Sequence, residues 1–238
     1  MAPLNSLMTL LALHVGAAAE VPTSGTSEWW DKPWRSGFIK ESQPGAVSLG
    51  FTGLAGDEQA DLVHHGGPDK ALCVYPAEHY PFWNETLHPV TFPWGSFGEN
   101  LTTQGLIENE ICIGDIFTLP RGTVVQVSQP RQPCWKLARR WRIKDFALQL
   151  EQTGRTGWYF RVLKPGSLSA GDTLRLTQRP HPDWTISRAN ALMHHQRDNR
   201  TDAAELARCP ALSKSWQQTL SARSQGDAPS PTRRLEQP

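Results

Sequence analysis

Two segments of the chain carry the same pattern, and this pattern limits the folds open to the sequence. In each, a Gly-Asp pair, Gly114-Asp115 or Gly171-Asp172, is followed by alternating residues. A tight Gly-Asp turn that leads into such alternation is typical of a strand with one buried face. We therefore predict a mainly β fold, and the recurring spacing favours a β-barrel.

Further strands and helices are predicted from short apolar stretches bounded by Gly, Pro and polar residues. The predicted strands are Leu7–Val15, Phe38–Lys40, Ala46–Leu49, Cys112–Leu119, Thr123–Ser128, Trp158–Leu163 and Thr173–Gln178. Helices are predicted at Pro76–Leu87, Lys136–Arg142 and Lys144–Gln152. Proline costs about 3 kcal/mol inside a helix, so Pro81 is expected either to begin the first of these helices or to kink it.

The N-terminal segment Leu4–Ala19 imitates a signal peptide because it is apolar and ends in alanines. It lacks the positively charged start of such a signal, and His14 and Gly16 interrupt it. It is also too short to span a bilayer. We therefore expect Leu7–Val15 to be the first strand, and we expect no membrane partner.

The pattern becomes helical after Arg179–Pro182, whose prolines cannot continue a β-ladder. Apolar residues recur at helical spacing in the segments Thr185–His195, Asp202–Arg208 and Ser213–Ser224. We predict a barrel domain over residues 1–179 and a small three-helix unit over residues 183–225. The polar, proline-rich residues 226–238 are predicted to be disordered.

Charge and cysteine content exclude some classes of protein. The 238 residues include 24 basic and 23 acidic ones, with a net charge of +1, so a general nucleic-acid-binding role is not expected. The four cysteines, Cys73, Cys112, Cys134 and Cys209, are widely spread. They match neither a disulfide framework nor paired metal ligands, which favours reduced thiols in a cytoplasmic protein.

Cys134 is the strongest candidate for a reactive group. It follows an apolar stretch that ends near Val127, and Pro130 and Pro133 stiffen the approach to it. Arg131 and Lys136 flank it, and cationic neighbours favour the thiolate, which attacks electrophiles and binds soft metals. An ordinary cysteine is more often a small buried hydrophobe, so the prediction depends on this environment.

Two polar loops are further candidates for the site. His65-Gly66-Gly67 and Lys70 lie in one loop, whose backbone N–H groups could form an anion-binding nest; the alternative is a tight polar turn. Asn100 lies in the other loop, where its amide could bond to the edge of a heterocycle or cap its own turn. Adjacent histidines without a second ligand pair do not indicate structural zinc.

Several motifs in the same order resemble the MOSC family, which is named after the C-terminal domain of molybdenum cofactor sulfurases, and in particular its stand-alone YiiM-like branch. The resemblance spans residues 7 to 225. The segments that carry it are Gly53–Asp61, His64–Leu72, Tyr75, His79-Tyr80, Phe97–Leu101, Gly114-Asp115, Ser128–Leu137 and Gly157–Leu163.

The resemblance implies a MOSC-type β-barrel with a few helices, followed by a small C-terminal three-helix unit, that binds the molybdenum cofactor, a molybdopterin. Cys134 would be the sulfur ligand to molybdenum. The branch is associated with detoxifying reduction of N-hydroxylated compounds such as 6-N-hydroxylaminopurine, with electrons from a separate flavoprotein reductase. The three-helix unit would serve docking or self-association, for example as a homodimer.

Within this reading, His65, Lys70, Arg131 and Lys136 would hold the pterin phosphate or balance negative charge. The wall of the loops would be formed by Gly66, Gly67, Asn100 and Ser128. One alternative is a non-catalytic cofactor or sulfur carrier that uses a Cys134 persulfide. Another is a cysteine hydrolase with His65 as base, although the sequence offers no third group to orient it.

Overall fold

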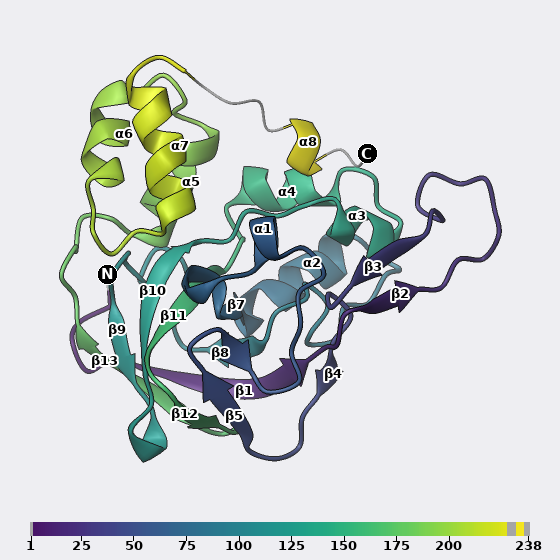
Figure 1. Ribbon diagram of the computed structural model, residues 1–238, viewed down its shortest axis with the longest axis horizontal. Helices are drawn as coiled ribbons and strands as arrows, with labels where there is room; N and C mark the ends of the chain where they lie inside the picture. The colour runs from purple at the N-terminus through teal and green to yellow at the C-terminus, as the bar shows by residue number, and fades with distance from the viewer. Residues whose placement is uncertain (1, 228–231, 236–238) are drawn as a thin grey trace.

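The fold is built on a closed β-barrel (Figure 1). The computed structural model of the protein describes residues 2–227 and 232–235. Within these residues, seven strands follow the order β13-β9-β10-β11-β7-β8-β1, and β1 pairs back with β13. The strands are β1 (Leu7–Val15), β7 (Leu72–Pro76), β8 (Leu101–Gln104), β9 (Ile116–Thr118), β10 (Val124–Pro130), β11 (Trp158–Lys164) and β13 (Thr173–Gln178). Strands β7 and β8 run parallel, whereas the other neighbours in the barrel are antiparallel.

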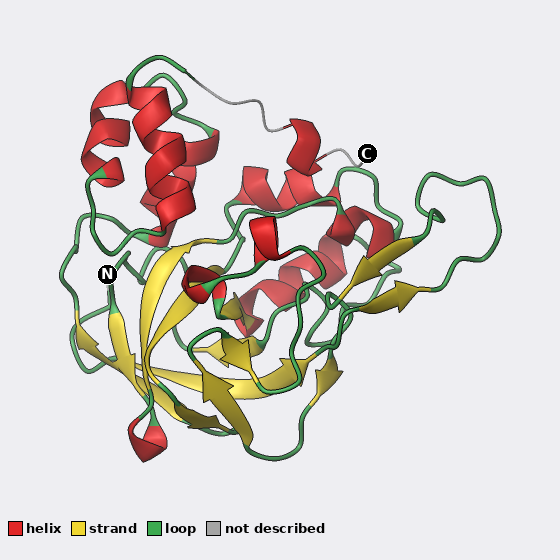
Figure 2. Ribbon diagram, viewed as in Figure 1, coloured by secondary structure: helices red, strands yellow, loops and turns green. Residues whose placement is uncertain are grey.

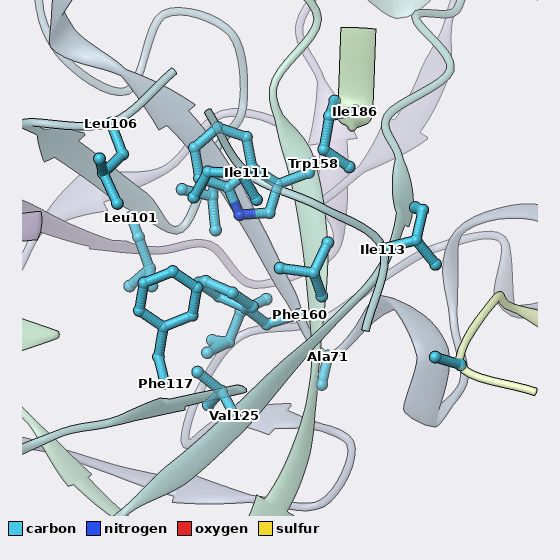
Figure 3. Packing of buried hydrophobic residues seen from close by; sticks show 14 of the residues in the cluster. Ala71, Leu101, Leu106, Ile111, Ile113, Phe117, Val125, Trp158, Phe160 and Ile186 are labelled. Atoms are coloured by element: carbon cyan, nitrogen blue, oxygen red, sulfur yellow. The ribbon is translucent and has the colours of Figure 1, made fainter. Parts of the chain in front are cut away.

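Apolar side chains from these strands fill the barrel. Along β1, Met8 and Leu10 are fully buried while Leu7 is exposed, as the period of two in a strand requires. Figure 3 labels Phe117 and Phe160 in this core. Their rings meet edge to face, with centroids 5.6 Å apart. The aromatic pair therefore joins β9 to β11 across the interior of the barrel.

Shorter strands surround the barrel (Figure 2). Strand β4 (Glu41–Ser42) extends one end of β1. Strands β5 (Val47–Gly50), β6 (Gly53–Leu54) and β12 (Gly166–Leu168) form a small sheet. The ribbon of β2 (Ala19–Val21) and β3 (Trp34–Ser36) carries the long loop at the right of Figure 1.

Helices cover one side of the barrel and lie beside a second, largely aromatic cluster. They are α1 (Leu62–His65), η1 (Pro68–Lys70), η2 (Ala77–His79), α2 (Tyr80–Thr86), α3 (Lys136–Trp141) and α4 (Phe146–Thr153), while η3 (Pro120–Gly122) makes the β9–β10 turn. The cluster includes Tyr75, Trp83, Phe97 and Phe146. Phe97 stacks on Tyr75 at 4.1 Å. This packing fixes α2 and α4 relative to β7.

The C-terminal helices α5 (Ile186–His194), α6 (Arg200–Ala207) and α7 (Lys214–Ser224) lie together at the upper left of Figure 1. The side chain of Ser213 caps α7 by accepting from Trp216 N at 3.4 Å. Ile186 and Trp216 belong to the same buried cluster as the barrel residue Phe117. The helical unit and the barrel therefore share one core.

The predicted fold class is confirmed, and β1 has the predicted bounds. The predicted strand Cys112–Leu119 is shorter in the structure, where β9 covers Ile116–Thr118 and pairs with β10. Helix α2 begins at Tyr80, which places Pro81 in its first turn, where no N–H is needed. The predicted strand Phe38–Lys40 is wrong. Phe38 packs instead against the aromatic cluster, so its apolar character reflects a buried loop rather than a strand.

The tail predicted to be disordered is described at residues 226–227 and 232–235, where Thr232–Leu235 forms the short helix α8. The rest of that prediction lies outside the described residues. No helix of the described chain is both long and apolar enough to cross a membrane.

Candidate functional site

A pocket lies where the loop after β10 meets the loops that follow β3, β6 and α1. It brings together six of the predicted site residues, His65, Lys70, Asn100, Arg131, Cys134 and Lys136. The other lining residues are Ser36, Gly37, Phe38, Lys40, Asp57, Glu58, Gln59, Ala60, Cys73, Gly98, Gln132 and Tyr159. Its free volume is about 70 Å³. It can therefore enclose the end of a ligand, and the rest of a larger ligand would lie across its mouth.

Cys134 lies in the loop between β10 and α3. Its side chain lines the pocket, although the residue is only 6% exposed. Arg131 N donates to Gly157 O at 3.1 Å at one end of the loop, and Leu137 N donates to Cys134 O at 3.1 Å at the other. The predicted stiff approach to the thiol is thus fixed by backbone hydrogen bonds as well as by proline.

Arg131 is the most unusual charged group in the pocket. It is 5% exposed, and its Nη1 has no hydrogen-bond partner among the described residues. Burial lowers its pKa, but Cys73, Tyr159 and Cys134 raise it, and the net shift is upward. A buried guanidinium with an unused N–H is costly unless an acceptor binds to it, so Arg131 is suited to hold an anionic ligand.

Other cations surround Arg131. Lys136 also lines the pocket. Burial lowers its pKa, and the nearby Cys134 offsets only part of that shift. Burial also lowers the pKa of Lys70. The Nζ of Lys70 donates to His64 O at 2.5 Å. Lys40 forms a buried ion pair with Asp57. Pairing of Lys40 with Asp57 leaves the three cations Arg131, Lys136 and Lys70 against the one carboxylate of Glu58, so the pocket still favours an anion.

His65 is neutral at physiological pH. Burial, followed by the charges of Lys136 and Lys70, lowers its pKa to about 3. It can therefore donate or accept a hydrogen bond but adds no charge. The two nearest acids in the sequence have other partners: Asp61 bonds to the ring of the neighbouring His64 at 2.9 Å, and Asp69 pairs with Arg161 at 2.7 Å. The structure therefore gives no support to a hydrolase in which a carboxylate orients His65.

Asn100 lines the pocket but uses its amide inside the protein. Its Oδ1 accepts from Cys73 N at 3.0 Å, and its Nδ2 donates to His14 O at 3.3 Å. Asn100 therefore anchors β7 to the loop before β8. Asn100 lies in the wall of the pocket, as predicted, but its amide is used to hold the strands together.

Gly66, Gly67 and Ser128 are not among the lining residues of the pocket. Ser128 is buried, and its Oγ donates to Asp69 O at 2.5 Å. It thereby ties η1 to β10 and supports the loop that carries Lys70. Gly67 has φ of +93°, which favours glycine at this turn.

The other twelve lining residues were not predicted as site residues, and among them Lys40, Asp57, Cys73 and Tyr159 carry charged or reactive groups. Tyr159 lies opposite Cys73 in the pairing of β11 with β7. Asp57 and Tyr159 lie inside Gly53–Asp61 and Gly157–Leu163, two of the segments that carry the family resemblance. The sequence around Lys40 and Cys73 does not indicate a site, because only the folded barrel brings these two residues to Cys134.

Comparison with known proteins agrees with this site. The MOSC domain model matches residues 61–175, which include Cys134 and the loop of His65. A second model, the YiiM-like 3-alpha helix domain, matches residues 184–224. The chain belongs to the MOSC family. The second match places it in the YiiM-like branch, and the C-terminal helical unit is the part that this model covers.

Two bacterial relatives share most of their length with this MOSC protein. YflK of Bacillus subtilis (strain 168) is 48% identical over 192 residues, which are 80% of this chain and 86% of YflK. YiiM of Escherichia coli (strain K12) is 40% identical over 190 residues, which are 79% of this chain and 84% of YiiM. The crystal structure of YiiM from Escherichia coli matches with a TM-score of 0.75 and 32% identity, over 98% of this chain and 99% of that chain.

A third relative is larger. A protein of Gibberella moniliformis (strain M3125 / FGSC 7600) named "Reductase" is 35% identical over 177 residues. The match covers 74% of this chain but 31% of the fungal protein. The fungal protein therefore joins a region similar to this chain with a longer remainder.

Proposed function

We propose that this protein is a molybdenum-cofactor-dependent oxidoreductase that reduces N-hydroxylated compounds such as 6-N-hydroxylaminopurine. Its electrons would come from a separate flavoprotein reductase. The proposal is supported by membership of the MOSC family and by similarity to YiiM and to a fungal protein named reductase. A cytoplasmic location and homodimer formation belong to the same proposal.

One observation carries the proposal: the free N–H of buried Arg131 lies in the same cationic pocket as the Cys134 thiol. A molybdopterin needs a soft sulfur ligand for its metal and donors for its anionic phosphate. Cys134 provides the sulfur, and Arg131, Lys136 and Lys70 provide the donors. The residues present therefore fit this cofactor.

When bound, the cofactor supplies the two-electron redox chemistry. The reaction consumes two electrons and two protons, breaks the N–O bond, and yields an amine and water. Cys134 would hold the metal as a thiolate. Arg131 and Lys136 would bind the anionic end of the cofactor, and neutral His65 would offer a hydrogen bond without adding charge.

The surrounding loops define where substrate can enter. The enclosed part of the pocket is small, so it would hold one end of the cofactor, and a planar substrate would approach from solvent beside the part that lies across the mouth. Phe38 lines the pocket and offers an apolar surface next to the polar groups. Aromatic rings stack on heterocycles without sequence or substituent specificity, which suits a range of N-hydroxylated purines.

The test is to purify the protein from hosts that can and cannot make the cofactor. Molybdenum and pterin content are measured first, then reduction of 6-N-hydroxylaminopurine with a chemical reductant and with a flavoprotein reductase. Cofactor and turnover are expected only from the competent host. Cys134→Ala should remove turnover, whereas the control Cys112→Ala, outside the pocket, should retain it.

The possible outcomes separate the functions considered. Cofactor without turnover under either electron source would favour the carrier. Full turnover by a folded Cys134→Ala protein would refute the metal-ligand role of Cys134. Absence of molybdenum and pterin from protein made in the competent host would refute the proposal as a whole.

A further inference from the structure

We propose that the C-terminal segment Thr232–Leu235 completes the site, and that Arg234 is a positioning residue that fixes the loop carrying Cys134. This segment lies beyond residues 184–224, where the second family match ends. Its effect on turnover rests on the proposed function. Its effect on the thiol itself does not.

The segment bonds to the loop on both sides of the cysteine. Arg234 Nη1 donates to the backbone carbonyl of Pro133, and Trp135 N donates to Arg234 O at 3.1 Å. The residues directly before and after Cys134 are therefore held by the same residue of the C-terminal segment. Such bracketing restricts the backbone rotations that would move the thiol.

Arg234 is itself held in place by a buried acid. Glu151 of α4 forms an ion pair with it, and the Glu151 side chain is only 7% exposed. Burial raises the pKa of Glu151, and Arg234 is the strongest of the charges that lower it again. The other close partner of Glu151 is His194 Nδ1 at 3.4 Å, and the pKa of His194 is lowered to about 3, so it contributes no charge.

An apolar groove beside Trp135 agrees with the same placement. Leu235 lines a groove together with Trp29, Trp135 and Leu148. Trp135 also meets Trp34 edge to face at 5.3 Å. Figure 1 shows α8 beside α4 and close to α3. The residue after Cys134 thus packs against β3 and lines the same groove as Leu235.

These contacts connect distant parts of the chain. Glu151 joins α4 to His194 of α5 and to Arg234 of α8, and Arg234 joins α4 to the Cys134 loop. Loss of Arg234 leaves the Pro133 carbonyl without this donor and Glu151 without its strongest cation. We therefore expect the loop to open more often and to expose Cys134.

The experiment measures how fast each cysteine reacts with iodoacetamide in the cofactor-free protein, with mass spectrometry to resolve the sites. In Arg234→Ala we expect Cys134 to react about tenfold faster, because losing a hydrogen bond to a charged group shifts an opening equilibrium by about that factor. Cys112 and Cys209, which lie outside the pocket, serve as internal references and should keep their rates. Hydrogen exchange at the Trp135 amide should accelerate in parallel.

Two variants control the result. Arg175→Ala removes an exposed cation of β13, outside both the pocket and the groove, and should leave the Cys134 rate unchanged. Arg234→Lys keeps a positive charge that can still pair with Glu151, so it should restore most of the protection. In the loaded enzyme, Arg234→Ala should lower kcat more than it changes KM.

An unchanged Cys134 rate in Arg234→Ala overturns the proposal, as does an equal rise at all four cysteines, since that would indicate a general loss of stability. Both readouts use protein without cofactor. Failure of the proposed function would instead appear as missing molybdenum or turnover in the wild-type protein, so the two failures are distinguishable.

Discussion

Asn100 and Cys73 are bonded to each other in both directions. Asn100 N donates to Cys73 O at 2.8 Å, and Asn100 Oδ1 accepts from Cys73 N at 3.0 Å. The same amide reaches β1 through a bond from Nδ2 to His14 O at 3.3 Å. One buried side chain therefore links three strands directly beside the pocket that contains Cys134.

We predict that Asn100→Ala lowers the free energy of unfolding by about 1–3 kcal/mol, the usual penalty for leaving a buried partner unsatisfied. The variant leaves the Cys73 amide and the His14 carbonyl without their side-chain partner. The measurement is urea unfolding, with Asn109→Ala, at a position outside the Cys134 pocket, as the control. A midpoint equal to that of the wild-type protein would contradict this structural role.

We predict that Arg131→Ala weakens cofactor retention about ten- to hundredfold, because a hydrogen bond to a charged group contributes about 1.5–3 kcal/mol. Lys70→Ala should have the same direction and a smaller effect, since Lys70 also bonds to the His64 carbonyl. Pterin content after extended dialysis is the readout. Arg121→Ala, at a surface turn outside the pocket, should retain the cofactor, and equal retention in all three variants would show that Arg131 does not bind it.

The strand pattern was readable from the sequence because it depends on local alternation. The range Leu7–Val15 matches β1 at both ends, since its buried residues alternate along one strand. Phe38–Lys40 failed because only Phe38 packs against the aromatic cluster, from a loop, while Ile39 is 46% exposed. A short apolar stretch does not show whether its residues are held in a strand or in a loop.

The candidate site was readable where its residues share a segment with Cys134 or lie in a loop of unusual composition. Arg131 and Lys136 are near Cys134 in sequence, and His65 lies beside two glycines. Lys40 and Cys73 reach the pocket only through the closure of the barrel. No local pattern predicts such meetings, because they depend on the order of the strands.

We predict that the free energy of unfolding falls as the pH drops from about 6.5 towards 3, partly through His194. Burial, and then the charge of Arg234, lowers the pKa of His194 to about 3. The unfolded chain takes up the proton near pH 6.5 and so binds more protons in this range. The stability contributed by neutral His194 is therefore full above pH 6.5 and is lost through that window.

The measurement is urea unfolding at pH 7 and about pH 5, for the wild-type protein and His194→Gln. The wild-type protein should lose about 1–2 kcal/mol more than the variant, since one pKa unit is worth 1.36 kcal/mol. His88→Gln changes an exposed histidine and should follow the wild-type curve. Identical pH dependence in the wild-type protein and His194→Gln would show that His194 is not held neutral by burial.

We predict that a shortened chain ending at Gln178 does not fold stably, although the sequence alone favoured a separate barrel domain. Ile186 and Trp216 are buried in the same cluster as the barrel, and Ser213 N donates to Ser128 O of β10 at 2.9 Å. Each large apolar side chain buried contributes about 1.5–3 kcal/mol, and whole domains are stable by about 5–15 kcal/mol. Removing the helices should therefore remove most of the free energy of unfolding.

Soluble yield and thermal unfolding of the shortened chain are the readouts, and a chain ending at Asp227 is the control that keeps the shared core. A soluble barrel that melts cooperatively near the wild-type temperature would show that the barrel core is sufficient without the helices.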